Sequence, residues 1–171
     1  MHLRRPPTSR TADDPARVFP PIADTAVVLA YARMLERERS SGSQHTWLRG
    51  KNIGSLAGPG NGADEALFRQ AATELGARVT PLRPLPEAGL AATEIQVTAR
   101  LIGRLYDAVD WPGASSELLQ RIRLAAGIPI YDGLAATRHP TARLAGLLGP
   151  DAALIDRRRF VLQAVLLATM I

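Results

Sequence analysis

The sequence predicts an α/β fold, a single three-layer domain in which a four-stranded parallel sheet is flanked by helices. Short apolar segments typical of buried strands alternate with amphipathic segments of helical period between residues 51 and 131. Each interval between strands is long enough for the crossover helix that parallel strands require. The composition, 46% hydrophobic and 22% charged over 171 residues, is that of a globular domain with a sizeable core.

The first element is an arm. Residues 1–20 are rich in proline, carry the arginines of "MHLRRPPTSR" and show little apolar periodicity, so we expect a flexible basic segment. The domain itself is expected to span residues 21–171. It begins with an amphipathic helix over residues 22–39, which "SSGSQ" ends.

The alternating region follows. Strands are predicted at residues 51–56, 77–82, 107–111 and 128–131, with helices at 64–75, 94–105 and 115–126. Thr93 and Gln96 form a plausible capping box for the second of these helices. A helix over residues 141–148, a Gly149-Pro150 break and a last helix over about 152–171 complete the chain. The apolar run "FVLQAVLLATMI" predicts deep burial of that last helix.

Right-handed crossovers place the carboxyl ends of all strands at one edge of the sheet, where such folds bind ligands. The loop "AGPGNGA" falls at this edge, and glycine-rich loops between a strand and a helix often bind phosphate. Here the helix opens with Asp64 and Glu65, which would favour a cation or an amine instead. A simple tight turn without a ligand remains the alternative.

Composition limits the possible functions. The absence of cysteine excludes disulfides and thiol catalysis, and three scattered histidines make a zinc site improbable, so no metal or cofactor is expected. The net charge is +5, and three of the positive charges are the arginines of "MHLRRPPTSR", without which the rest of the chain is close to balanced at +5 − 3 = +2. Arg157–Arg159 is the basic run of the body and is expected on the solvent side of the last helix, so nucleic acid is not the expected partner. The longest apolar run is about half a bilayer span, and we expect a cytoplasmic protein without membrane segments.

Several segments resemble the carbamoyl-phosphate domain of ornithine carbamoyltransferases and, less closely, of aspartate carbamoyltransferases. They are "LRGKNIGSL", "ELGARVTPL", "VTARLIGRLYDAVDWPG" and "AAGIPIYDGLAATRHPTARLAGLLG". The most specific part is a strand, then Asp132-Gly133-Leu134, then His139-Pro140-Thr141 opening a helix. The resemblance implies a fold like the N-terminal domain of carbamoyltransferases.

The ligand-binding positions of that family are altered in this chain. Its Ser-Thr-Arg-Thr-Arg stretch, which binds carbamoyl phosphate, falls on Asn61, Gly62, Ala63, Asp64 and Glu65. The two arginines of the stretch align with Ala63 and Glu65, so both positive charges are lost, and Asp64 and Glu65 bring two carboxylates to the same place. Two like charges about 4 Å apart interact by roughly 4 kcal/mol at an effective dielectric constant near 20. We expect Asp64 and Glu65 to occupy the positive end of their helix themselves. These five residues, with His139 and Thr141, are the candidate ligand-binding residues.

The catalytic positions are altered as well. The family's catalytic arginine aligns with Pro112, and the glutamine of its His-Pro-Thr-Gln motif aligns with Ala142. His139 is retained, and the resemblance implies that it would polarise the carbamoyl carbonyl. The alternative, which we favour, is that His139 and Pro140 only shape and cap the following helix. No catalytic residue is therefore expected.

The domain organisation also departs from the family. There, the helix after His-Pro-Thr leads into a second domain that binds the amino acid, and the chain returns with a C-terminal helix. Here the last helix follows directly, so we expect the first domain closed by its own returning helix. Family members trimerise through this domain, with a loop that would fall near residues 83–93. The resemblance thus implies a homotrimer or association with a catalytic paralogue.

Together these features favour a carbamoyltransferase-like protein without catalytic activity, a pseudoenzyme with a binding, regulatory or assembly role and an unknown small-molecule ligand. The alternative is a divergent ornithine or aspartate carbamoyltransferase that is active only with a partner supplying the missing domain.

Overall fold

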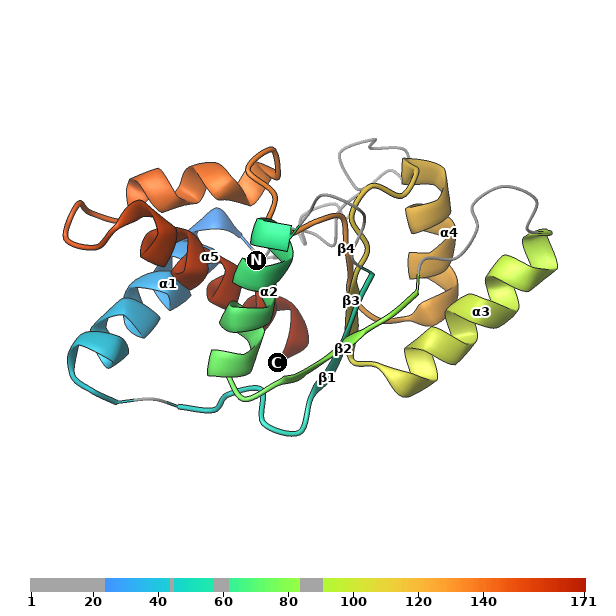
Figure 1. The fold of residues 1–171 in the computed structure, drawn as a ribbon, viewed down its shortest axis with the longest axis horizontal. Coiled ribbons are helices and arrows are strands. Elements are labelled where there is room, and N and C mark those ends of the chain that lie inside the picture. Colours follow the sequence, from blue (N-terminus) through green and yellow to red (C-terminus); the bar gives the residue numbers. More distant parts are fainter. Residues whose placement is uncertain (1–23, 44, 57–61, 84–90) are drawn as a thin grey trace, which may run out of the picture.

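A computed structural model describes residues 24–43, 45–56, 62–83 and 91–171, so the predicted arm lies outside the described residues. The expected α/β class is confirmed by a four-stranded parallel sheet with the strand order β2-β1-β3-β4 (Figure 1). All four strands fall within the predicted segments but are shorter: β1 Asn52–Ser55, β2 Arg78–Pro81, β3 Ala108–Asp110 and β4 Ile130–Tyr131.

The helices also fall where the periodicity indicates. They are α1 Thr25–Ser40, α2 Gly62–Glu74, α3 Ala92–Leu105, α4 Ser116–Ala126, η2 Pro140–Leu147 and α5 Leu154–Met170. Two details of the sequence prediction are wrong. The segment η2 is a 3₁₀ helix, and α3 starts earlier than expected because the Glu94 carboxylate accepts the backbone N–H of Ala91 at 2.7 Å. This contact takes the place of the predicted Thr93–Gln96 box.

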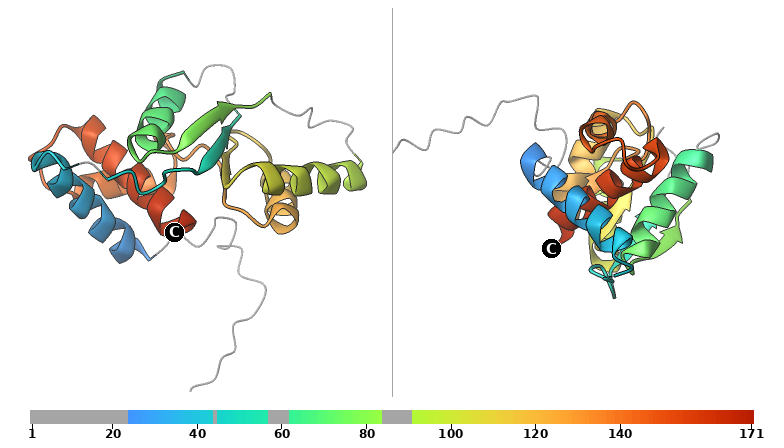
Figure 2. Two further views of the ribbon diagram at one scale, coloured as in Figure 1. Left: turned by 90° about the horizontal axis from the view of Figure 1, so that it is seen from below. Right: turned by 90° about the vertical axis from the view of Figure 1, so that its left-hand side faces the viewer.

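The two faces of the sheet are covered by different helices. The strand register puts Ile53, Ala108 and Tyr131 on one face, where α2 and α5 pack, with α1 and η2 in turn against α5. Val109 and Ile130 lie on the other face, under α3 and α4. Figure 2 shows these two groups of helices on opposite sides of the sheet. The result is the layered arrangement expected from sequence.

Helices α3 and α4 approach each other closely at one glycine. A Cβ atom on Gly103 would lie 2.0 Å from the carbonyl oxygen of Ala126, far inside any allowed contact. Only glycine therefore permits this approach.

Helix α5 is buried over nine consecutive residues, Arg159–Leu167, as the apolar run predicts. The position expected for its basic run is wrong, because Arg157–Arg159 face the protein. Arg157 and Arg158 donate to the carbonyl groups of Ala145 and Ala135, and Arg159 is only 5% exposed. Guanidinium groups can be buried in this way because each meets an acceptor or a carboxylate.

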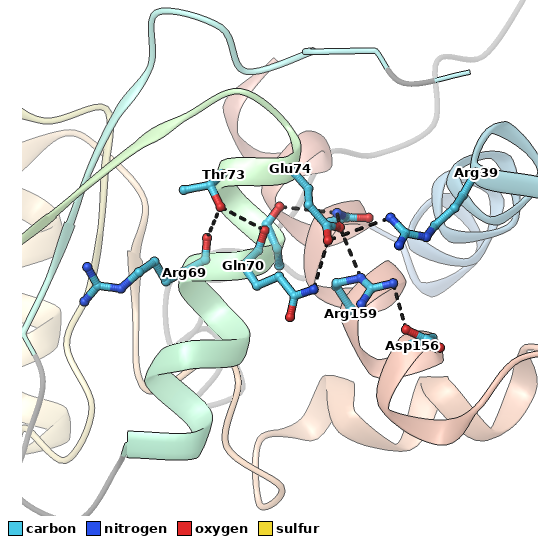
Figure 3. Close-up of polar contacts among 9 residues, drawn as sticks. Arg39, Arg69, Gln70, Thr73, Glu74, Asp156 and Arg159 are labelled. Carbon is cyan, nitrogen blue, oxygen red and sulfur yellow. Dashed lines mark hydrogen bonds and ion pairs between the residues drawn. The ribbon is translucent and has the colours of Figure 1, made fainter. Parts of the chain in front are cut away.

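The carboxylate that receives Arg159 is Glu74, at the end of α2 (Figure 3). The Arg159 Nε atom lies 3.1 Å from a Glu74 oxygen, and the Arg159 Nη2 atom lies 2.7 Å from Asp156. Gln163 of α5 donates to Glu74 at 2.9 Å, and Arg39 of α1 lies 3.8 Å away. Glu74 thus connects α1, α2 and α5. Over the described part of the chain, no helix has the length and apolarity needed to cross a membrane.

Candidate functional site

The carboxyl ends of β1 and β3 lie side by side at the edge where the sequence predicts a site. Ser55 and Asp110 are paired in the register, and both face the helices α2 and α5. Both are almost fully buried, with 2% and 6% of their surface exposed. A hydroxyl and a carboxyl group therefore lie next to each other beneath the start of α2.

These two residues form the floor of a hollow of about 30 Å³, here called the edge hollow. The first turn of α2 and the loops after β3 and β4 form its walls. Gly133 has a φ of +62°, a backbone angle that residues with a side chain rarely adopt, and turns the loop after β4 back towards Pro112. The lining residues are Ser55, Asp64, Glu65, Asp110, Pro112, Gly133, Ala135, Ala136 and Arg138.

Asp110 is a site residue that the sequence reasoning missed. Its Oδ1 atom accepts the backbone N–H of Leu134 at 3.0 Å. Burial raises the pKa of Asp110 to about 7; the Leu134 and Gly133 amides oppose this shift, and the carboxylates of Asp132 and Asp64 add to it. The signal was present in "DAVDW", where an acidic residue ends an otherwise apolar buried strand.

Asp64 and Glu65 lie in the first turn of α2. Asp64 Oδ1 is 3.9 Å from Arg158 of α5, and Glu65 pairs with Arg69 one turn later at 2.5 Å. Among the residues that the structure describes, the contacts found for these carboxylates are with arginine side chains. Of the other residues aligned with the family stretch, Asn61 lies outside the described residues, and Gly62 and Ala63 are exposed and do not line the edge hollow.

His139 and Thr141 do not line the edge hollow. His139 is the N-cap of η2, where its Nδ1 atom accepts the backbone N–H of Thr141 at 3.3 Å and lies 2.8 Å from the Thr141 hydroxyl. Burial lowers the pKa of His139, while the charge of Asp132 acts in the opposite direction. Thr141 and Ala142 line a separate small hollow beside α5. The structure therefore brings together Asp64, Glu65 and Pro112, but not the His-Pro-Thr residues.

The chemistry available in the edge hollow is hydrogen bonding and charge. Three carboxyl groups and one hydroxyl group face one guanidinium group, that of Arg138. In the described ranges, no three histidine, aspartate or glutamate side chains converge as metal ligands. The walls are thus suited to a small polar group of positive rather than negative charge.

No family model matches the chain. Solved structures do resemble it. Ornithine carbamoyltransferase from Pyrococcus furiosus is 23% identical with a TM-score of 0.62, covering 72% of this chain and 40% of that one. Anabolic ornithine carbamoyltransferase from Campylobacter jejuni is 22% identical with a TM-score of 0.59, covering 75% of this chain and 43% of that one. Aspartate transcarbamoylase from Trypanosoma cruzi is 19% identical with a TM-score of 0.56, and the match covers 74% of this chain and 40% of that one.

The chain thus spans about two-fifths of the length of these proteins. The structural match agrees with the resemblance seen in the sequence motifs. The protein has the fold of the ornithine and aspartate carbamoyltransferases over that part of their length.

Proposed function

We propose that this protein is a non-catalytic member of the carbamoyltransferase fold, which does not bind carbamoyl phosphate and has a binding, regulatory or assembly role. The main support is the charge of the edge hollow. Asp64, Glu65 and Asp110 contribute three carboxyl groups, against the one guanidinium of Arg138. Because Asp110 titrates at about pH 7, a phosphate group would enter surroundings with a formal charge between −2 + 1 = −1 and −3 + 1 = −2.

This charge opposes both binding and catalysis. At an effective dielectric constant near 20, each like-charge pair about 4 Å apart costs roughly 4 kcal/mol. Carbamoyl transfer from carbamoyl phosphate instead needs positive groups and hydrogen-bond donors fixed in advance around the phosphate. Pro112, which aligns with the family's catalytic arginine, offers neither a charge nor an N–H.

The nearby arginines do not restore the missing attraction. Arg158 donates to the carbonyl of Ala135 and lies close to Asp64, while Arg69 pairs with Glu65. Both cations are therefore engaged by acceptors of the protein itself. Neither arginine lines the edge hollow, so neither is placed to bind an anionic substrate there.

The connection between η2 and α5 gives a second line of support. In this chain, α5 begins seven positions after the end of η2, at Leu154, and packs against α1. The resemblance implies that family members carry a second domain at this point, and the connection in this chain is too short to contain one. We take α5 as the returning helix that closes the first domain.

Calorimetric titration with carbamoyl phosphate tests the proposal, with ornithine carbamoyltransferase as the positive control. We expect no saturable heat up to millimolar concentrations, and no formation of citrulline or carbamoyl-aspartate in a coupled assay. The double variant Asp64→Ala, Glu65→Ala separates repulsion from the lack of donors, because it removes both charges and adds no N–H group. Saturable binding of carbamoyl phosphate to the unmodified chain would overturn the proposal.

Association is the part of this proposal that concerns partners. The resemblance implies a homotrimer or a complex with a catalytic paralogue, through a segment near residues 83–93, of which residues 84–90 lie outside the described ranges. Light scattering after size exclusion should give about three times the 18.4 kDa chain mass for a homotrimer. A mass of one chain, unchanged after mixing with an active carbamoyltransferase, would contradict both forms of association.

A further inference from the structure

The edge hollow has a feature that the proposed loss of phosphate binding does not explain. Ser55 is 98% buried at the carboxyl end of β1, paired in register with Asp110 and lining the hollow. Across the described residues, its hydroxyl group makes no hydrogen bond with the protein. The hydroxyl oxygen does not belong to the fully buried side-chain atoms that lack a partner, so it keeps accessible surface at the hollow and is available to a molecule there.

The neighbouring groups determine which charge such a molecule would carry. Within the described structure, the hydrogen bonds that Asp110 accepts come from backbone amides, and no cation is paired with it. Asp64 and Glu65 face the same space from the first turn of α2. Their partners Arg158 and Arg69 are not among the residues that line the hollow. Three acceptor groups around one small space favour a positively charged donor.

Size and coordination narrow the choice of cation. A hollow of about 30 Å³ accepts a group of only a few heavy atoms. A metal ion is disfavoured because the described acidic side chains are not arranged as a set of three ligands. A primary ammonium group is compact and offers three N–H donors, which suits a hydroxyl group and two or more carboxyl oxygens.

We propose that the edge hollow binds the primary ammonium group of a small organic amine through Ser55, Asp110 and one of the two carboxylates at the start of α2, Asp64 or Glu65. The inference rests on the proposed function, because a hollow that held phosphate would need the opposite charge. Arg138, which also lines the hollow, is exposed.

The test uses the full chain labelled with ¹⁵N and ethylammonium chloride as the probe, followed by NMR. We expect saturable shifts of the backbone amides of Ser55, Leu134 and the first turn of α2, with a millimolar Kd, because three heavy atoms cannot support tighter binding. Tetramethylammonium chloride at the same concentration should give none of these shifts, since it has no N–H donor. Equal shifts with both salts, or shifts that never saturate, would overturn the proposal.

Variants connect the binding to the named groups. Asp110→Asn should weaken ethylammonium binding at least tenfold while it keeps the acceptor for the Leu134 amide. Ser55→Ala should weaken binding about threefold and removes only one oxygen. Glu117→Gln, at an exposed carboxylate in the first turn of α4, is the matched control and should leave the Kd unchanged. Binding that is unaffected by both Asp110→Asn and Ser55→Ala would refute the assignment.

Two further probes separate this inference from the proposed function. Tighter binding of Mg²⁺ than of ethylammonium at the same amides would make the hollow a metal site and refute the amine assignment alone. Saturable binding of inorganic phosphate there would overturn the proposed function and this inference together. If neither phosphate nor ethylammonium binds, the amine assignment fails and the proposed function stands.

Discussion

The buried carboxyl group of Asp110 should make the stability of this protein depend on pH in an unusual direction. Its pKa rises from 3.8 to about 7 on folding. Between these two values the folded chain holds a proton that the unfolded chain releases. The contribution of Asp110 is therefore fully favourable below about pH 4 and is lost as the pH rises towards 7.

The substitution Asp110→Asn isolates this effect. Asparagine keeps an oxygen for the Leu134 amide but has no charge to bury. A shift of about 3 pKa units corresponds to roughly 4 kcal/mol at about 1.4 kcal/mol per unit. At pH 4 the variant and the unmodified chain should have nearly the same free energy of unfolding. At pH 8 the free energy of unfolding of the variant should be higher by about 4 kcal/mol.

Urea denaturation followed by circular dichroism at several pH values between 4 and 8 measures this difference. Comparing the two proteins at each pH cancels the contributions of all other titrating groups. Asp107→Asn is the matched control, because folding lowers the pKa of Asp107 whereas it raises the pKa of Asp110. Burial raises the pKa of Asp107, but hydrogen bonds from the Asn52 amide and Lys51 outweigh this and lower it.

Asp107 therefore contributes stability that is present at neutral pH and lost as the pH falls through its lowered pKa. Asp107→Asn should destabilise the protein at pH 7, with a smaller deficit in acid. A difference between Asp110→Asn and the unmodified chain that stays constant from pH 4 to 8 would refute the burial argument. So would a variant that is less stable at pH 8.

Three further predictions concern stability. Glu74→Gln leaves the buried Arg159 with one carboxylate fewer and should lower the free energy of unfolding by about 1–3 kcal/mol in urea titrations, below the 3–5 kcal/mol of a fully buried pair because Glu74 is partly exposed. Gly103→Ala forces α3 from α4 and should cost about 1–3 kcal/mol, whereas Gly146→Ala, where a Cβ meets nothing within 4 Å, should cost little; equal effects would contradict the close-approach argument. Ser115→Ala removes the N-cap of α4 and should lower stability by about 1 kcal/mol, seen as a lower Tm.

The fold class was accessible from sequence because it depends on local patterns. Apolar strands and amphipathic helices alternate, and the α4 cap at Ser115 and the end of that helix at Gly127 are marked by local residue types. Strand lengths were less accessible. The segment 128–131 reads as one strand, yet only Ile130 and Tyr131 pair with β3, because pairing depends on where the neighbouring strand ends.

The site was only partly predictable, since its contacts join distant segments. Asp64, Glu65 and Pro112 could be named from the motif alignment. Ser55 and Asp110 could not, because their importance comes from the register that pairs them beneath α2. The prediction that Arg159 faces solvent was wrong for the same reason, because its partner Glu74 lies on another helix and no local pattern indicates the pair.

The charges of the edge hollow and the closure by α5 depend on each other. Arg158 belongs to α5 and approaches Asp64 of α2, while its guanidinium group is held by the carbonyl of Ala135 in the loop after β4. A carboxylate at position 64 without α5 would face Asp110 with one nearby cation fewer. The same helix buries its basic run against η2 and α2, where the carbonyl of Ala145 and the carboxylate of Glu74 receive it. A reversed charge at the start of α2 is thus compatible with a stable domain because α5 packs here and supplies the compensating arginine.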